Sequence, residues 1–159
     1  MSTIDGAVVV LTKSPAPGRS KTRLCPPLSE AEAADVARAA LVDTLGAVCG
    51  SNASRYVVAL DGEVGPWLPP GIDVIAQRGG GLDERLANAF EDVGERAVII
   101  AMDTPQVTAT LLDGALARLS DVDAVLGPTT DGGYWTIGLA DPRRDVIRGV
   151  PMSSTDTWA

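Results

Sequence analysis

The apolar stretch AVVVL, Ala7 to Leu11, runs almost directly into the loop KSPAPGRSKTRL, Lys13 to Leu24. An unbroken β-branched run is typical of a strand buried on both faces of a parallel sheet, and we expect a strand over Gly6 to Thr12. The loop contains both lysines of the chain together with Arg19 and Arg23, and it carries no acidic residue. The sequence therefore predicts a buried strand that ends in a basic loop suited to an anion.

Strands and helices alternate along the rest of the chain. Further strands are expected at Arg55–Leu60, Ile72–Ala76, Ala97–Met102, Ala124–Leu126 and Tyr134–Leu139. Helices are expected from about residue 30 to Val48, over Leu82–Val93 and over Thr108–Leu119. Because most of these strands are apolar throughout and helices separate them, the pattern predicts an α/β protein: a three-layer α/β/α, Rossmann-like sandwich around a mainly parallel sheet.

Local signals refine this pattern. Ser29 stands three residues before a glutamate, which is the spacing of a capping box at the start of the first helix. Val36 in the first helix and Leu82 in the second are expected to face inward. The strand Tyr134–Leu139 is expected to lie antiparallel at one edge of the sheet. Asp141–Arg148 is expected to be a polar turn or a short helix.

The length and charge of the chain limit its class. At 159 residues, the expectation is one domain, 1–159, whose final SSTDTWA resembles a helix start and makes the domain short at its C-terminus. A formal net charge of -8 argues against nonspecific binding to nucleic acid. No apolar run approaches the ~20 residues that span a membrane, and no export signal is visible, so the expected location is cytoplasmic.

The residue types also exclude several kinds of chemistry. The chain has no histidine, which removes the Ser-His-Asp triad and imidazole zinc sites. Cys25 and Cys49 have no partners at metal-ligand spacing and are expected to be reduced thiols. Any metal must therefore be bound by carboxylates, which suit Mg²⁺ or Mn²⁺.

Ligands of a parallel sheet bind where the carboxyl ends of its strands meet. The loops gathered at that edge are predicted to be the basic loop, QRGGG (77–81), DTP (103–105) and GPTTDGG (127–133). The three glycines of QRGGG permit close approach to a ligand, but they are also common in mobile loops. Trp67, Tyr134 and Trp135 could stack on a base or sugar, or they could simply be buried.

The basic loop has two interpretations. Its charges could be solvated side chains on an ordinary connection between a strand and a helix. Alternatively, the prolines and Gly18 turn the backbone so that its basic side chains converge on one anion. These side chains are Lys13, Arg19, Lys21 and Arg23. The loop is not a Walker A motif, because Lys13 stands where the first glycine is required, and it lacks the GxGxxG of a dinucleotide fold.

Two aspartates are candidates for chemistry at the same edge. Asp103 follows an apolar strand, where it could cap a helix or hold a divalent cation that bridges two phosphates. Asp131 precedes two glycines, where it could form a tight turn, share the metal or act as general base on an acceptor hydroxyl.

Four segments carry a family resemblance: KSPAPGRSKTRL, QRGGGLDERLANAF, AMDTP and GPTTDGGYWTIGL. In this order they resemble the bacterial nucleotide-diphospho-sugar transferase family with a glycosyltransferase-A-type fold, in the branch of arsenosugar-biosynthesis-type glycosyltransferases. The resemblance spans nearly the whole chain. The chain departs from the family pattern at Ala101, where a glycine is common, and at Met152, where a tryptophan is usual.

The resemblance implies roles for individual residues. The first loop would contact the diphosphate and base of a nucleotide, Asp103 would be the metal-binding acid, and Asp131 would face the acceptor. The nucleotide-binding residues implied in this way are Lys13, Pro17, Gly18, Lys21, Arg23, Gln77, Gly81 and Arg85.

Three functional hypotheses follow. The first is a Mg²⁺- or Mn²⁺-dependent transferase that glycosylates a small acceptor from a nucleotide-diphospho-sugar, with Lys21 stabilising the leaving diphosphate and Asp131 acting on the acceptor. The second is a nucleotidyltransferase similar to 2-phospho-lactate guanylyltransferase, which would use a nucleoside triphosphate. The third is a noncatalytic nucleotide-binding module. Base, sugar, acceptor and the presence of a homodimer stay open.

Overall fold

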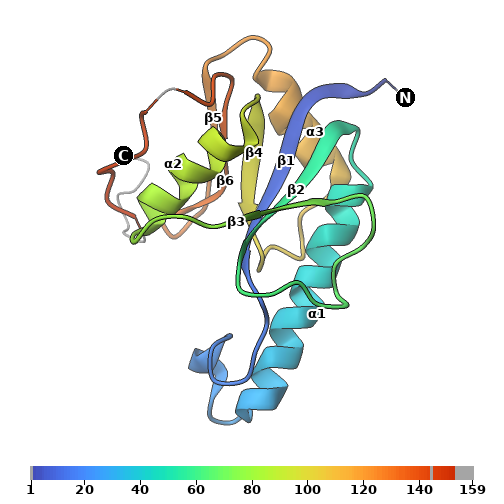
Figure 1. Ribbon diagram of the computed structural model, residues 1–159, viewed down its shortest axis with the longest axis vertical. Helices are drawn as coiled ribbons and strands as arrows, with labels where there is room; N and C mark the ends of the chain where they lie inside the picture. The colour runs from blue at the N-terminus through green and yellow to red at the C-terminus, as the bar shows by residue number, and fades with distance from the viewer. Residues whose placement is uncertain (1, 144, 153–159) are drawn as a thin grey trace.

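The computed structural model describes residues 2–143 and 145–152 (Figure 1). Its elements are β1 (Ile4–Lys13), the 3-10 turn η1 (Thr22–Leu24), α1 (Glu30–Cys49), β2 (Ala53–Asp61), β3 (Asp73–Ala76), α2 (Leu82–Val93), β4 (Ala97–Ala101), α3 (Ala109–Arg118), β5 (Ala124–Pro128) and β6 (Tyr134–Leu139). Six strands form one sheet in the order β3-β2-β1-β4-β6-β5. The predicted α/β architecture with a mainly parallel sheet is confirmed.

β1 lies inside the sheet because it is apolar on both faces. It pairs in parallel with β2 on one side and with β4 on the other. Val8 and Val10 pack in the core cluster that includes residues of α1 and α3, whereas Ala7 and Val9 pack in the cluster of α2. All four side chains are fully buried, as expected for a strand covered by helices on both faces.

Helices cover both faces of the sheet and complete the three layers (Figure 1). α1 begins at the predicted capping box: the Ser29 hydroxyl accepts from the backbone N–H of Glu32 at 3.2 Å, and the Glu32 carboxylate accepts from the Ser29 N–H at 2.8 Å. Leu41 of α1 and Leu112 of α3 are buried on one face, and Phe90 of α2 is buried on the other.

The position of β6 corrects one expectation. The strand is antiparallel, as expected, but it lies inside the sheet between β4 and β5, so that β5 forms the edge. The five-residue connection 129–133 is typical of antiparallel neighbours and places β6 beside β5. On its other side β6 pairs with β4. Gly138 of β6 is closely packed between the two neighbouring strands. A Cβ at this position would lie 2.8 Å from a methyl carbon of Val98 in β4 and 2.7 Å from one of Val125 in β5.

Two side chains that were expected to face inward are exposed. Val36 lies on the solvent side of α1, because the buried stripe of this helix runs through Ala33, Ala37 and Leu41 instead. Leu82 lies in the first turn of α2, where it projects at the edge of the sheet rather than onto its face; 36% of its surface is exposed.

The segment after β6 contains no helix among its described residues, so the turn alternative is confirmed for that part of Asp141–Arg148. The segment is fastened to α2: Arg148 donates to the Glu91 carboxylate at 3.0 Å, and the Gly149 N–H donates to Asp83 at 2.8 Å. The expected helix start at SSTDTWA lies outside the described residues. Within residues 2–143 and 145–152, no helix is long and apolar enough to cross a membrane.

The strand order determines where a ligand can bind. From β1 the chain passes through α1 to β2 on one side, whereas β4 lies on the other side of β1. Because β1 and β4 are parallel neighbours, their carboxyl ends lie side by side at the edge where ligands of parallel sheets bind. The basic loop follows β1, Asp103 follows β4, and both line a crevice at this edge.

Candidate functional site

The basic loop folds into a compact turn after β1. The Ser20 hydroxyl accepts a hydrogen bond from the Ala16 N–H at 3.1 Å, and the Ser20 N–H returns one to the Ala16 carbonyl at 3.1 Å. Gly18 has a φ of 74° in this turn, and Lys21 adopts the left-handed region with a φ of 49°. A non-glycine residue in that region is uncommon, and such conformations cluster at functional sites.

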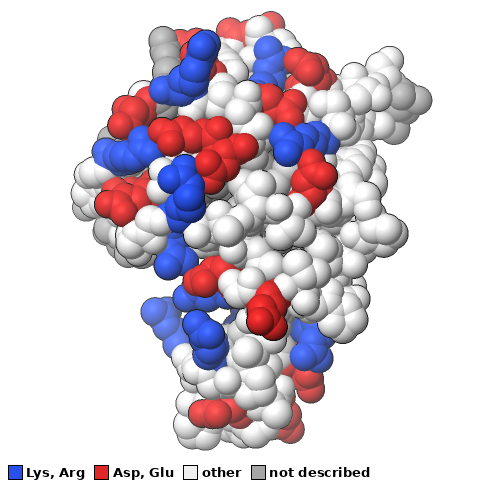
Figure 2. Space-filling view, viewed as in Figure 1, with Lys and Arg blue, Asp and Glu red and all other residues white. Residues whose placement is uncertain are grey.

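The four basic side chains of the loop converge, as the second interpretation of the loop requires. They line a cavity of about 390 Å³, called here the basic cavity. Its lining is Lys13, Arg19, Ser20, Lys21, Thr22, Arg23, Leu24, Ala37, Met102 and Asp103. Figure 2 shows Lys and Arg side chains gathered around a hollow in the lower half of the view. The volume falls in the range of small-molecule sites.

Asp103 lies directly after β4 and faces the basic loop. Its Oδ2 is 4.0 Å from Nζ of Lys21, and 57% of its side chain is exposed. A pair at this distance and exposure contributes little to stability. Asp103 also lines a second cavity on the other side, so its carboxylate stands in the wall that the two cavities share.

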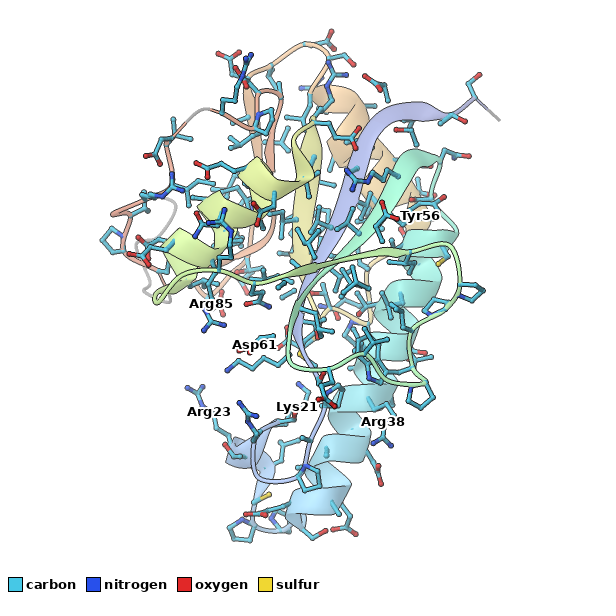
Figure 3. The ribbon with its side chains drawn as sticks, viewed as in Figure 1. Lys21, Arg23, Arg38, Tyr56, Asp61 and Arg85 are labelled. Carbon is cyan, nitrogen blue, oxygen red and sulfur yellow. The ribbon has the colours of Figure 1, made fainter. Side chains whose placement is uncertain are left out.

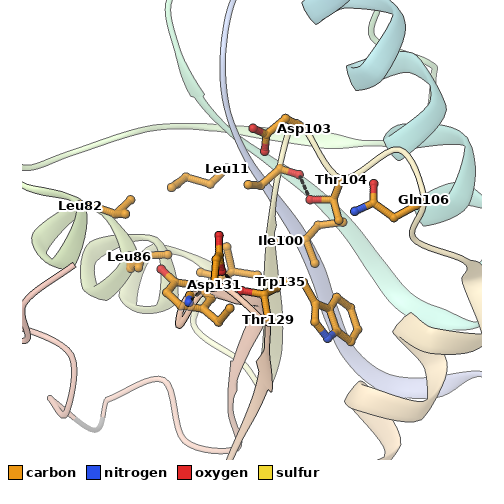
Figure 4. Close-up of a pocket in the computed structure, with 14 residues that line it drawn as sticks. Leu11, Leu82, Leu86, Ile100, Asp103, Thr104, Gln106, Thr129, Asp131 and Trp135 are labelled. Carbon is orange, nitrogen blue, oxygen red and sulfur yellow. Dashed lines mark hydrogen bonds between the residues drawn. The ribbon is translucent and has the colours of Figure 1, made fainter. Parts of the chain in front are cut away.

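The second cavity, called here the apolar cavity, has a volume of about 450 Å³ (Figure 4). Its lining is Leu11, Leu82, Leu86, Ile99, Ile100, Ala101, Asp103, Thr104, Gln106, Thr129, Asp131, Gly133, Tyr134 and Trp135. Leu82 is exposed because its side chain forms part of the wall of the apolar cavity. Tyr134 and Trp135 lie at this wall rather than wholly in the core.

Asp131 lies in the tight turn between β5 and β6. Its Oδ1 accepts hydrogen bonds from the Thr129 hydroxyl and from the Gly133 N–H, the latter at 3.0 Å. The Thr129 hydroxyl, followed by the Gly133 N–H, holds the pKa of Asp131 below its usual value. The turn interpretation of Asp131 is therefore confirmed, and the same carboxylate is ionised where it lines the apolar cavity.

Gln77 and Arg85 form a separate polar cluster at the ends of β1 and β2. The Gln77 amide donates to the carbonyls of Thr12 at 2.7 Å and Ala59 at 3.0 Å, and it accepts from Nη1 of Arg85 at 3.0 Å. The same Nη1 donates to Asp61 at 3.0 Å. Neither Gln77 nor Arg85 lines the basic or the apolar cavity.

Asp61 is a member of this polar cluster that the sequence analysis missed. It ends β2 directly beside Lys13, its partner in the parallel register. The hydrogen bond from Arg85 lowers the pKa of Asp61, and the charges of Arg85, Lys13 and Arg19 lower it further. In Figure 3, Lys21 and Arg23 lie below Asp61, at the end of β2, and Arg85, in α2. An aspartate directly after the strand RYVVAL is the same signal that identified Asp103.

Three other residues that were predicted to bind the nucleotide shape the backbone and do not line the cavities. Gly18 and Pro17 belong to the turn of the basic loop but do not line the basic cavity. A Cβ on Gly18 would lie 3.2 Å from a carboxylate oxygen of Glu30, so a larger residue would crowd the start of α1. Gly81 is the N-cap of α2 and lines neither cavity.

The described residues contain no group of three or more His, Cys, Asp or Glu that could hold a metal ion by themselves. Asp103 nevertheless fits one kind of metal site. Mg²⁺ and similar cations need one or two protein carboxylates where substrate phosphates supply further oxygens, and the basic cavity beside Asp103 suits phosphates.

Comparison with known proteins agrees with this architecture. A provisionally named nucleotide-diphospho-sugar transferase from Desulfovibrio desulfuricans G20 is 30% identical in sequence, with a TM-score of 0.81; the similarity covers 99% of this chain and 72% of that chain. No curated protein matches the sequence significantly.

Two further proteins share the fold at lower identity. Rv0371c from Mycobacterium tuberculosis H37Rv is 19% identical, with a TM-score of 0.57 over 87% of this chain and 72% of that chain, and another structure of it is a complex with manganese. The 2-C-methyl-D-erythritol 4-phosphate cytidylyltransferase of Thermus thermophilus is 18% identical, with a TM-score of 0.50 over 82% of this chain and 57% of that chain. At these identities the similarity shows the fold alone.

The predicted nucleotide-diphospho-sugar transferase fold is thus confirmed, and the 30% identical neighbour supports a transferase-type enzyme. Residues 33–154 match the model of one protein family, which covers most of the chain. The chain belongs to this family, described as an uncharacterized protein conserved in bacteria (DUF2064).

Proposed function

We propose that the protein is a transferase that binds a nucleotide-diphospho-sugar in the basic cavity and passes the sugar to a small acceptor in the apolar cavity. One observation carries the proposal: Asp103 stands in the wall shared by the two cavities, with the basic side chains on one side of it. The 30% identical neighbour, named for a nucleotide-diphospho-sugar transferase, supports the same reaction class.

In this reaction the acceptor oxygen forms a bond to the anomeric carbon of the sugar. The bond from that carbon to the diphosphate oxygen breaks, and the nucleoside diphosphate leaves with the electron pair. Asp131 takes the proton of the acceptor hydroxyl and releases it to water, because its carboxylate lines the cavity that holds the acceptor.

The basic side chains act on the leaving group. Lys21 and Arg23 bind the diphosphate oxygens, on which negative charge grows as the bond breaks, and stabilisation of such charge is usually the largest catalytic term. A Mg²⁺ or Mn²⁺ ion held by Asp103 and by the phosphate oxygens would supply further positive charge there. The manganese complex of Rv0371c supports a metal of this kind.

Nucleotidyl transfer is the second candidate, because four basic side chains can also accommodate a triphosphate and because a cytidylyltransferase shares the fold. The acceptor oxygen would then attack the α-phosphorus and release pyrophosphate. A noncatalytic nucleotide-binding module is the third.

A thermal-shift panel of nucleoside triphosphates and nucleotide sugars, with and without Mg²⁺ or Mn²⁺, followed by product analysis, separates these candidates. The proposal predicts that a nucleotide sugar raises the melting temperature and is converted to nucleoside diphosphate and a glycoside. Release of pyrophosphate from a triphosphate would establish the second candidate instead. Stabilisation without any product from either donor class would favour the third.

A further inference from the structure

We propose that the apolar cavity takes an acceptor alcohol that carries no phosphate or carboxylate group and that presents an apolar face to the wall. This inference rests on the proposed function, because it specifies the acceptor of that transfer. It goes further by excluding the anionic compounds from the acceptors.

The lining of the apolar cavity carries the first argument. Its charged groups are the carboxylates of Asp103 and Asp131, and no lysine or arginine of the described chain lines it. A phosphate or carboxylate placed here would face the Asp131 carboxylate without a lysine or arginine as counter-charge, which costs free energy in a partly dehydrated site.

The start of α2 carries the second argument. A helix N-terminus beside a cavity normally attracts anions, because its first N–H groups are free and its dipole is positive. Here the first turn already holds two acids, Asp83 and Glu84. The Asp83 carboxylate accepts from the Gly149 N–H at 2.8 Å, and the Glu84 carboxylate accepts from the Gly80 N–H at 2.8 Å. These carboxylates lie at the positive end of the α2 dipole and offset its charge. Little attraction is left for an anionic acceptor.

The nearby basic side chains carry the third argument. Arg85 lies one turn after Leu82, but its Nη1 is engaged by Asp61 and Gln77, each at 3.0 Å. Lys21 lies on the basic side of Asp103. Arg85 and Lys21 are thus engaged elsewhere, and the apolar cavity must bind its ligand by means other than lysine or arginine side chains.

The remaining lining indicates what those means are. Leu82, Leu86 and Trp135 offer an apolar wall, and the Thr129, Gln106 and Asp131 side chains offer hydrogen-bonding groups for hydroxyls. This combination fits a polyol or glycoside with an apolar face or substituent. It disfavours sugar phosphates and hydroxy acids, including acceptors of the phospho-lactate type.

Binding to the apolar cavity can be measured without any donor. The chain has three tryptophans, Trp67, Trp135 and Trp158, of which Trp135 lines the cavity. A double variant, Trp67→Phe with Trp158→Phe, leaves Trp135 as the single tryptophan reporter. Its fluorescence is titrated with matched pairs that differ by one phosphate: phenyl β-D-glucoside and its 6-phosphate, and glycerol and glycerol 3-phosphate.

The proposal predicts that the uncharged member of a pair perturbs Trp135 with an affinity at least about tenfold higher than its phosphate. Equal or tighter binding of the phosphates would overturn it, and so would the failure of every uncharged probe. A second variant, Gln106→Lys, adds a cation at an exposed position of the lining and is expected to shift the preference toward the phosphates. An unchanged ratio in this variant would contradict the electrostatic argument.

A failure of this inference can be distinguished from a failure of the proposed function. The donor is tested separately, by calorimetric titration of a nucleoside diphosphate into the protein and into Lys21→Ala. If the nucleotide binds in a Lys21-dependent manner while phosphorylated probes perturb Trp135, the acceptor class is wrong and the donor site stands. If Lys21→Ala leaves nucleotide binding unchanged, the donor site itself is wrong.

Discussion

The two sides of Asp103 are built in different ways. The basic cavity draws its four cations from eleven positions of sequence, Lys13 to Arg23, folded into one turn. The apolar cavity is assembled from β1, α2, β4, β6 and the loops after β4 and β5. An anion site can thus be encoded locally, by charge and turn residues, whereas a site for an uncharged compound depends on tertiary packing of separate elements.

The difference has a consequence for binding. The basic cavity should recognise charge and hence respond to ionic strength and to single charge deletions. The apolar cavity should recognise shape and hydroxyl groups, and it should respond to neither. Four experiments, taken here in order of expected effect, probe this contrast.

Asp103 belongs to both sides, and its removal should have the largest effect. Asp103→Ala is expected to lower kcat by about 10²- to 10³-fold, because the charge of the leaving group loses its metal-dependent stabilisation. The melting temperature should hardly change, since most of the Asp103 side chain is exposed. Initial rates and thermal unfolding measure the two quantities. Asp35→Ala, at an exposed acid of α1 outside both cavities, is the matched control. Full activity of Asp103→Ala would remove this residue from the mechanism.

Lys21 belongs to the basic side alone. Lys21→Ala is expected to weaken nucleotide diphosphate binding by about tenfold or more, because a charge-assisted bond to phosphate contributes roughly 1.5–3 kcal/mol. Titration calorimetry gives the affinity. Arg38→Ala, which removes an exposed cation that pairs with Asp35 on α1, should leave that affinity unchanged. Equal losses in the two variants would mean that the effect reports overall charge rather than the basic cavity.

Ionic strength should act on one cavity and spare the other. An increase from about 0.05 M to about 0.5 M salt is expected to weaken nucleotide binding several-fold, because the Debye length shortens and exposed cations are screened. The affinity of an uncharged glycoside, followed by Trp135 fluorescence, should stay constant over the same range. A parallel loss of both affinities would erase the proposed contrast between the cavities.

The smallest expected effect is the change in melting temperature on substitution of Asp131, and it depends on pH. The hydrogen bonds from Thr129 and Gly133 lower its pKa in the folded state. They therefore add stability above the ordinary aspartate pKa of about 3.9, and this contribution is lost as the pH falls through the lower folded value. The melting temperature of Asp131→Asn should lie slightly below that of the native protein at neutral pH, and the gap should close in acid. A gap that widens in acid would contradict this assignment.

The sequence was sufficient for features whose signal is local. The continuous apolar run of β1 predicted a buried strand, and Ser29 with Glu32 predicted the start of α1; both are confirmed. The convergence of Lys13, Arg19, Lys21 and Arg23 was one of two interpretations that the sequence left open, and the four residues line one cavity in the structure. In these cases neighbouring residues determine the outcome, so a short window contains the information.

Features that depend on distant partners were missed or misplaced. The sequence predicts β6 as an antiparallel strand at an edge, but its place inside the sheet results from pairing with both β4 and β5. Leu82 has helical core spacing, yet it lies where α2 meets the crevice. The cluster of Asp61, Gln77 and Arg85 joins three separate segments, and its hydrogen bonds can be known only once the sheet brings those segments together.

The central claim is that a nucleotide diphosphate lies on the basic side of Asp103. A crystal structure of the protein with a nucleoside diphosphate and Mn²⁺ tests it most directly. The account predicts phosphate oxygens within hydrogen-bonding distance of Lys21 and Arg23, and the metal between those oxygens and Asp103. Phosphates in the apolar cavity, against Thr129 and Trp135, would contradict it.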